Sequence, residues 1–186
     1  MTRQRFHDLL HNCAELTAYQ RATEIGDALV TTTITDQDST WNAPVEERIL
    51  FGLFCVLHHA GANGLEYMWT INEMASVETM ASALEGLQLI GENQMYELAL
   101  LFWNYKITPA VEKGLQFPAK FSDAKRGDYD EMEEVIVEAD VPIELPQEIE
   151  QPSDSFVSCC DTSFPDSILN WIRTFEDRLA ARICRD

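Results

Sequence analysis

Apolar side chains recur every three or four residues along most of the chain, which is the spacing of one face of an amphipathic helix. The first such face comprises Phe6, Leu9, Leu10, Cys13, Leu16 and Thr17. The last, in the stretch 164–185, comprises Ile168, Leu169, Trp171, Ile172, Phe175, Leu179 and Ile183. The pattern predicts an all-α fold, a single compact multi-helix domain over residues 1–186, onto whose core the last helix docks.

Start and stop signals divide the middle of the chain into three predicted helices. Asn42 and Pro44 open a run of apolar residues that ends in glycines, which predicts a central buried helix. Ser76 precedes another helical pattern, and Gly91 provides its stop signal. A third pattern starts at Glu92, so we expect two antiparallel neighbours with a tight connection.

Two stretches carry signals against helix formation. β-Branched threonines follow Gly26, so residues 29–40 are predicted to form a loop or a short extended piece. Residues from Pro109 to Pro118 are predicted to form a second loop.

Composition is ordinary for a globular protein, but the charge is not. The 186 residues include 32 Asp and Glu against 13 Lys and Arg, which gives a net charge of -19. Such a field repels nucleic acid and anionic lipid, and it accelerates the encounter with basic proteins. Direct nucleic-acid binding is therefore excluded. No leader sequence or membrane-spanning run is present, so we expect a cytoplasmic protein without a membrane partner.

The acidic residues concentrate between positions 123 and 154, where Lys125 and Arg126 are the only basic residues. Helical spacing is clear from Asp128 to about Glu138, and residues three or four apart on a helix lie about 5 to 6 Å from one another. Beyond Val141 the prolines exclude a long helix, which predicts an acidic, partly irregular segment before the C-terminal helix.

A second set of carboxylates recurs every seven residues at Glu78, Glu85 and Glu92, and Glu66 and Glu73 repeat the same interval. Regular carboxylates on rigid helices resemble the charge array of duplex DNA, which carries one negative charge per about 1.7 Å of axis. We therefore predict an acidic partner-binding surface that comprises Asp128, Asp130, Glu131, Glu133, Glu134, Glu138, Glu78, Glu85 and Glu92.

Candidates for catalysis and metal binding are few. Cys55, His58 and His59 lie three and four residues apart and could approach a common face, which leaves a small metal-dependent enzyme as an alternative. Their apolar neighbours favour a buried helix instead. His7 and His11 are one helical turn apart, a geometry that can chelate a metal but is typical of an exposed terminal helix. No nucleophile-elbow, Walker or dinucleotide-binding motif is present. The sequence predicts no enzyme, no cofactor and no metal.

Five cysteines without a CxxC pair predict reduced thiols rather than a disulfide framework. The pair Cys159 and Cys160 is adjacent in sequence. Free cysteines commonly behave as small apolar side chains, so these thiols suggest no further chemistry.

The segment after the central helix contains a spaced motif. It comprises Asn63, Gly64, Tyr67, Trp69, Asn72, Ile90 and Gly91. In these residues the chain resembles a bacterial acidic all-helical DNA-mimic protein family, whose signature reads Asn-Gly-Gly, a short aromatic segment, Asn, and a helix that ends in Ile-Gly. The resemblance covers about residues 45–105. It departs from the pattern at Leu65, where a second glycine is expected, and at Glu73 and Met74.

The resemblance implies a structural role for Asn63, Gly64, Asn72 and Gly91 at helix ends. It also implies a homodimer, and a non-enzymatic protein that occupies the nucleic-acid-binding surface of a basic protein such as a transcription factor. The charge of the chain leads to the same expectation. An immunity or antitoxin protein that neutralises a basic nuclease toxin is the alternative, because it would use the same acidic surface.

Overall fold

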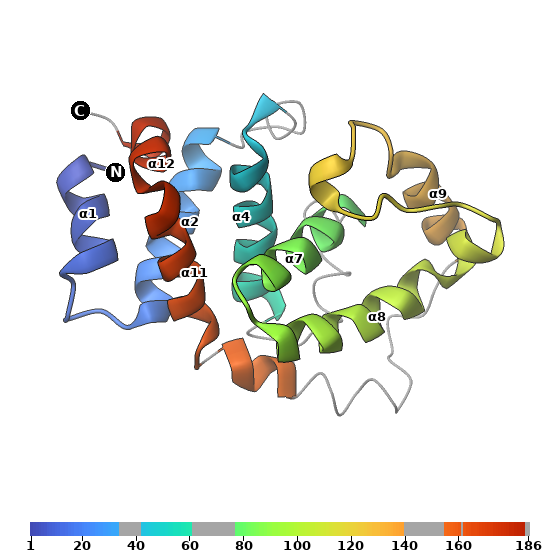
Figure 1. The fold of residues 1–186 in the computed structure, drawn as a ribbon, viewed down its shortest axis with the longest axis horizontal. Helices are drawn as coiled ribbons and strands as arrows, with labels where there is room; N and C mark the ends of the chain where they lie inside the picture. The colour runs from blue at the N-terminus through green and yellow to red at the C-terminus, as the bar shows by residue number, and fades with distance from the viewer. Residues whose placement is uncertain (34–41, 61–76, 140–154, 161, 185–186) are drawn as a thin grey trace.

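The computed structural model describes residues 1–33, 42–60, 77–139, 155–160 and 162–184 (Figure 1). Every regular element in these ranges is helical and none is a strand, which confirms the predicted all-α class. None of the helices described there is long and apolar enough to cross a membrane. Several predicted features lie outside the described residues: Asn63, Gly64, Asn72, Glu66, Glu73 and the acidic segment beyond residue 139.

Helix α4 (Val45–Cys55) lies in the middle of the molecule and continues into a π-helical turn, Val56–Ala60 (Figure 1). On one side of α4 lie α1 (Arg3–His11), α2 (Ala18–Thr33), α11 (Phe164–Ile172) and α12 (Glu176–Ile183). On the other side lie α7 (Val77–Leu89), α8 (Asn93–Glu112) and α9 (Asp130–Glu138). The prediction of a central buried helix is therefore confirmed: Leu50 and Leu53 are fully buried.

Small residues let α4 and α7 pack closely, and this is the most extensive helix pair in the described chain. A Cβ atom added at Gly52 would lie 2.7 Å from the backbone nitrogen of Ala83 and would collide with Ser82 Oγ. One added at Gly86 would lie 2.7 Å from Leu53 Cγ. Each helix therefore has a glycine at its close contact with the other helix, because a larger side chain at that position would push the two helices apart.

Two elements near the N-terminus differ from the sequence prediction. The first helix ends at His11, so Cys13, Leu16 and Thr17 do not extend its apolar face. Thr17 instead starts α2: its hydroxyl accepts from the Gln20 backbone N–H at 3.2 Å, and its own N–H donates to Gln20 Oε1 at 2.9 Å. This reciprocal pair is a capping box, which satisfies donors that a helix start leaves without partners.

The loop predicted over residues 29–40 is wrong for residues 29–33, because α2 continues to Thr33. Residues 34–40 lie outside the described part of the chain. Thr31 and Thr32 donate from their hydroxyls to the carbonyls of Asp27 and Ala28, one turn earlier, which satisfies these side chains within the helix. Leu29 is fully buried, and α2 packs against α11, α12, α4 and α1. Tertiary packing therefore outweighs the modest helix propensity of the threonines.

The loop predicted from Pro109 to Pro118 is also wrong in its first part, because α8 includes Pro109 and ends at Glu112. Ala110 is fully buried, and this burial favours continuation of the helix beyond the proline. Gly114, with φ +84°, ends it: its N–H donates to Val111 O, and that of Leu115 donates to Ala110 O. This arrangement is a Schellman motif, which favours glycine at the left-handed position.

Gly91 ends α7 in the same way, as the sequence predicts. Its φ is +81°, its N–H donates to Gln88 O at 3.2 Å, and that of Glu92 donates to Leu87 O at 3.0 Å. The link from Ile90 to Glu92 is short and leads into α8, which packs against α7. The tight connection predicted between these helices is confirmed.

The C-terminal helix is interrupted by one turn of 3-10 helix, Arg173–Phe175, which separates α11 from α12. Both halves contribute to the core through the predicted apolar stripe, with Ile168, Ile172, Leu179 and Ile183 fully buried. Both also pack against α2. The predicted docking of this segment on the core is therefore observed, as two helices rather than one.

Candidate functional site

Helix α9 presents carboxylates to solvent along its outer side. Its sequence, DEMEEVIVE, contains no basic residue, and three of its four apolar side chains, Met132, Val135 and Ile136, are buried. The exposed carboxylates are Asp130, Glu131, Glu134 and Glu138, with Asp128 just before the helix. We refer to these five residues as the α9 acidic face. Helical spacing predicted from the sequence therefore places five of the nine expected residues together on an exposed surface.

Few internal contacts occupy these carboxylates. Glu138 Oε2 lies 3.6 Å from Lys113 Nζ in an exposed ion pair, which is a weak interaction in water. Asp128 Oδ2 accepts from the Lys125 backbone N–H at 2.7 Å. Val137 lies on the same side as Asp130 and Glu134, and 72% of its surface is exposed, so an apolar side chain is available among the acids.

The inner side of α9 holds the helix to its neighbours. Glu133 is half-buried and accepts a hydrogen bond from the backbone N–H of Val77, at the start of α7. Burial raises the pKa of Glu133, and this hydrogen bond opposes the shift. Tyr129 is buried and stacks on Phe121, with ring centroids 6.3 Å apart. Glu133 is therefore a structural residue as the chain is folded, although the sequence predicts it as part of the binding surface.

The predicted row of Glu78, Glu85 and Glu92 needs correction, because internal partners engage these residues. Glu85 accepts two hydrogen bonds from Ser122, from the backbone N–H and from Oγ, each at 2.7 Å. Glu92 accepts from Ser167 Oγ at 2.5 Å and Ser163 Oγ at 3.3 Å, and it follows the end of α7 rather than lying on it. All three carboxylates are partly buried.

Glu78 faces a partly buried arginine. Burial lowers the pKa of Arg48, and the charges of Glu78 and Tyr129 oppose that shift. Arg48 also lies over the Phe121 ring, 5.0 Å from its centroid. The seven-residue spacing places these glutamates on one face of a helix, but the Phe121–Asp123 turn packs against α7 there. The sequence alone does not predict that this turn packs against α7.

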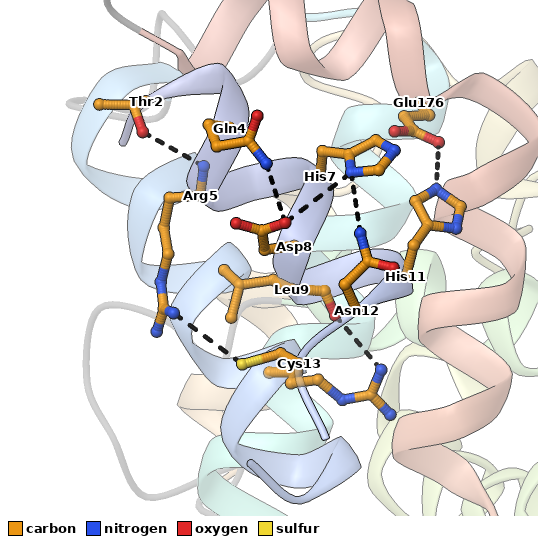
Figure 2. Close-up of polar contacts among 11 residues, drawn as sticks. Thr2, Gln4, Arg5, His7, Asp8, Leu9, His11, Asn12, Cys13 and Glu176 are labelled. Carbon is orange, nitrogen blue, oxygen red and sulfur yellow. Dashed lines mark hydrogen bonds and ion pairs between the residues drawn. The ribbon is translucent and has the colours of Figure 1, made fainter. Parts of the chain in front are cut away.

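A different cluster forms where the first and last helices meet. His7 and His11 of α1 and Glu176 of α12 bring one ligand atom each within 4.8 Å of the others. His11 Nε2 lies 2.7 Å from Glu176 Oε2, and the two imidazole centroids are 4.7 Å apart (Figure 2). Sequence spacing identifies the two histidines, but Glu176 lies far along the chain and no sequence signal connects it to them.

Cys55, His58 and His59 do not assemble as a metal-ligand set among the described residues. Cys55 is buried, and burial raises the pKa of its thiol to about 12. His58 is exposed, with Nε2 3.6 Å from Asp27 Oδ1, and its ring centroid lies 6.0 Å from that of His59. Burial, and to a lesser degree His58, lower the pKa of His59. The cavity beside them holds about 30 Å³, which is room for about one water molecule.

The five cysteines carry no disulfide, as the sequence predicts. Comparisons with protein-family models, with curated proteins and with solved structures found no match for the chain.

Proposed function

We propose that the chain is a non-enzymatic binding protein whose α9 acidic face binds the basic, nucleic-acid-binding surface of a partner protein. The observation that supports this proposal is the arrangement of Asp130, Glu131, Glu134 and Glu138, exposed on one helix that contains no basic residue. A net charge of -19 adds a long-range attraction for a basic partner. The packing of α9 against α8 and the cap that Glu133 forms on α7 keep the face in place.

The charge density of α9 is comparable to that of one DNA strand. From Asp130 to Glu138 the helix advances about 12 Å. Over the same length a single strand of duplex DNA presents about four phosphates. The helix offers four exposed carboxylates over this distance, so a surface of Lys and Arg side chains spaced for DNA meets a similar number of negative charges. Val137, exposed among them, adds apolar contact that DNA phosphates lack.

Capture of a partner from the native lysate tests the proposal. The wild-type chain is immobilised at low and moderate salt, retained basic proteins are identified, and duplex DNA is added as competitor. We expect a nucleic-acid-binding protein that DNA displaces, with an affinity that falls as salt rises because salt screens exposed charges. If no basic partner is retained at either salt, or if DNA does not displace it, the proposal is wrong.

Variants locate the surface. Combined Asp130→Asn, Glu131→Gln and Glu134→Gln substitutions remove charge from the α9 acidic face. Combined Glu15→Gln, Glu97→Gln and Asp177→Asn substitutions remove the same charge from exposed positions outside α9. We expect the first set to weaken binding much more than the second. Equal losses would mean that the net charge, and not the α9 acidic face, determines binding. A retained nuclease toxin would favour the immunity alternative.

A further inference from the structure

The cluster of His7, His11 and Glu176 lies at the end of the molecule opposite α9 (Figure 1) and plays no part in the proposed function. We propose that these three side chains bind one divalent transition-metal ion of the zinc class, which joins α1 to α12. Two imidazoles and one carboxylate, with water at the remaining position, form a known type of tetrahedral zinc site. Nitrogen ligands favour such ions over Mg²⁺ or Ca²⁺, which prefer oxygen.

The distances in the cluster suit an ion after a small movement. Two ligands that lie 2.1 Å from a tetrahedral centre are about 3.4 Å apart. The ligand atoms of the three side chains lie within 4.8 Å of one another, and His11 Nε2 is already 2.7 Å from Glu176 Oε2. The remaining adjustment falls on His7, whose side chain is 53% exposed and whose Nδ1 contacts the exposed groups Asp8 Oδ1 and Asn12 Nδ2. An ion would separate His11 and Glu176 slightly and draw His7 in.

The neighbours of His7 lie at its Nδ1 and leave Nε2 on the side of the other two ligands. Its Nδ1 lies 4.0 Å from Asp8 Oδ1, and Gln4 Nε2 donates to the same oxygen at 2.9 Å (Figure 2). Asn12 Nδ2 lies 3.5 Å from the same Nδ1. When Nε2 binds an ion, Nδ1 carries the proton, so Asp8 Oδ1 would accept from it and the Asn12 amide nitrogen would have to turn away. In Figure 2 Nε2 of His7 points away from Asp8, towards His11 and Glu176.

Helices α1 and α12 are each held to neighbouring elements around the cluster. The last carbonyls of α1 accept from guanidinium groups: Leu9 O from Arg21 at 3.3 Å, and Leu10 O from Arg173. Such contacts satisfy acceptors that a helix end leaves without partners. Helix α12 is held by its fully buried Leu179 and Ile183 and by its packing against α2. The fold therefore places the backbones of the two helices that carry the ligands, which reduces the ordering that an ion would require to the side chains.

Titration of the purified 186-residue chain with Zn²⁺, followed by calorimetry, tests the proposal. We expect one ion per chain, and at least a tenfold loss of affinity in each of His7→Gln, His11→Gln and Glu176→Gln. The matched control is His58→Gln, an exposed histidine outside the cluster, which should bind as the wild type does. The wild type should also gain thermal stability with Zn²⁺, because an ion that binds only the folded state stabilises it.

Co²⁺ distinguishes this site from binding by the thiols, since thiolate ligands give an intense charge-transfer absorption that imidazole and carboxylate ligands lack. We expect the weaker visible bands of a nitrogen and oxygen site, and their loss in His11→Gln. Far-UV circular dichroism verifies that each variant is folded. The proposal is overturned if the wild type binds neither ion at millimolar concentration, if the ligand substitutions leave the affinity unchanged, or if thiolate absorption dominates.

Discussion

The closeness of α4 and α7 at Gly52 leads to a quantitative prediction for Gly52→Ala. The new Cβ would lie 2.7 Å from the backbone nitrogen of Ala83, whereas ordinary contacts are 3.4 Å or more, so the helices must separate by about 0.7 Å. Overpacking of this kind costs about 1 to 3 kcal/mol, and the upper value applies because the contact is with backbone. The better helix propensity of alanine returns about 1 kcal/mol. The net loss is therefore about 2 kcal/mol.

Urea denaturation followed by circular dichroism measures this loss, and a thermal scan should show Tm lower by about 4 to 8 °C. Adding Ser82→Ala to the variant removes the Oγ collision but leaves Ala83 in place, so we expect only partial recovery. Gly86→Ala, whose Cβ meets side-chain atoms of Leu53, should cost less. A Gly52→Ala protein as stable as the wild type would refute the inferred separation of the helices.

Three further predictions concern single side chains. Glu85→Ala should lose about 2 kcal/mol of stability in urea, because two charge-assisted hydrogen bonds from Ser122 disappear. Glu131→Ala, at an exposed position, should change the stability by less than about 0.5 kcal/mol. Equal losses in the two variants would contradict the role of these hydrogen bonds. Burial raises the pKa of Glu47 above its ordinary 4.5. The stability of the wild type relative to Glu47→Gln should therefore be highest below pH 4.5 and fall as pH rises through the raised pKa. Urea titrations about one pH unit apart measure this difference, and a stability difference that stays constant between pH 4 and 8 would disprove the burial. Burial raises the pKa of Cys55 to about 12. This thiol should therefore resist iodoacetamide at about pH 8 in the native protein and react after unfolding, which peptide mass spectrometry measures. Rapid labelling of Cys55 in the native protein would refute the prediction.

Apolar spacing together with start and stop signals was sufficient to predict the all-α class, the central helix α4 and the stop of α7 at Gly91, because each depends on local pattern and backbone freedom. Local rules failed at Thr31, Thr32 and Pro109, which lie inside helices. Threonine disfavours a helix by less than about 1 kcal/mol, whereas proline disfavours a helix interior by about 3 kcal/mol. Packing of the buried neighbours Leu29 and Ala110 outweighs these costs. The sequence contains those neighbours but not the surfaces they contact.

The candidate sites show the same limit. The exposed part of α9 follows from helical spacing, since its apolar positions identify which side is buried. The same reasoning fails for Glu85 and Glu92, because their serine partners come from a distant turn and from α11. It fails again for Glu176, which joins His7 and His11 only in the folded chain. Contacts between residues far apart in sequence depend on the tertiary arrangement, which local pattern does not specify.

The packing of α2 has a consequence for synthesis of the chain on the ribosome. Its fully buried residues Ala22, Ile25 and Leu29 belong to a helix that α11 and α12 cover. These partners begin roughly 130 residues after α2 ends, and at cellular rates of elongation that interval takes on the order of ten seconds. During this time α11 and α12 are not yet available to cover the apolar side of α2. We therefore expect chaperones that bind exposed apolar segments to bind α2 in the nascent chain.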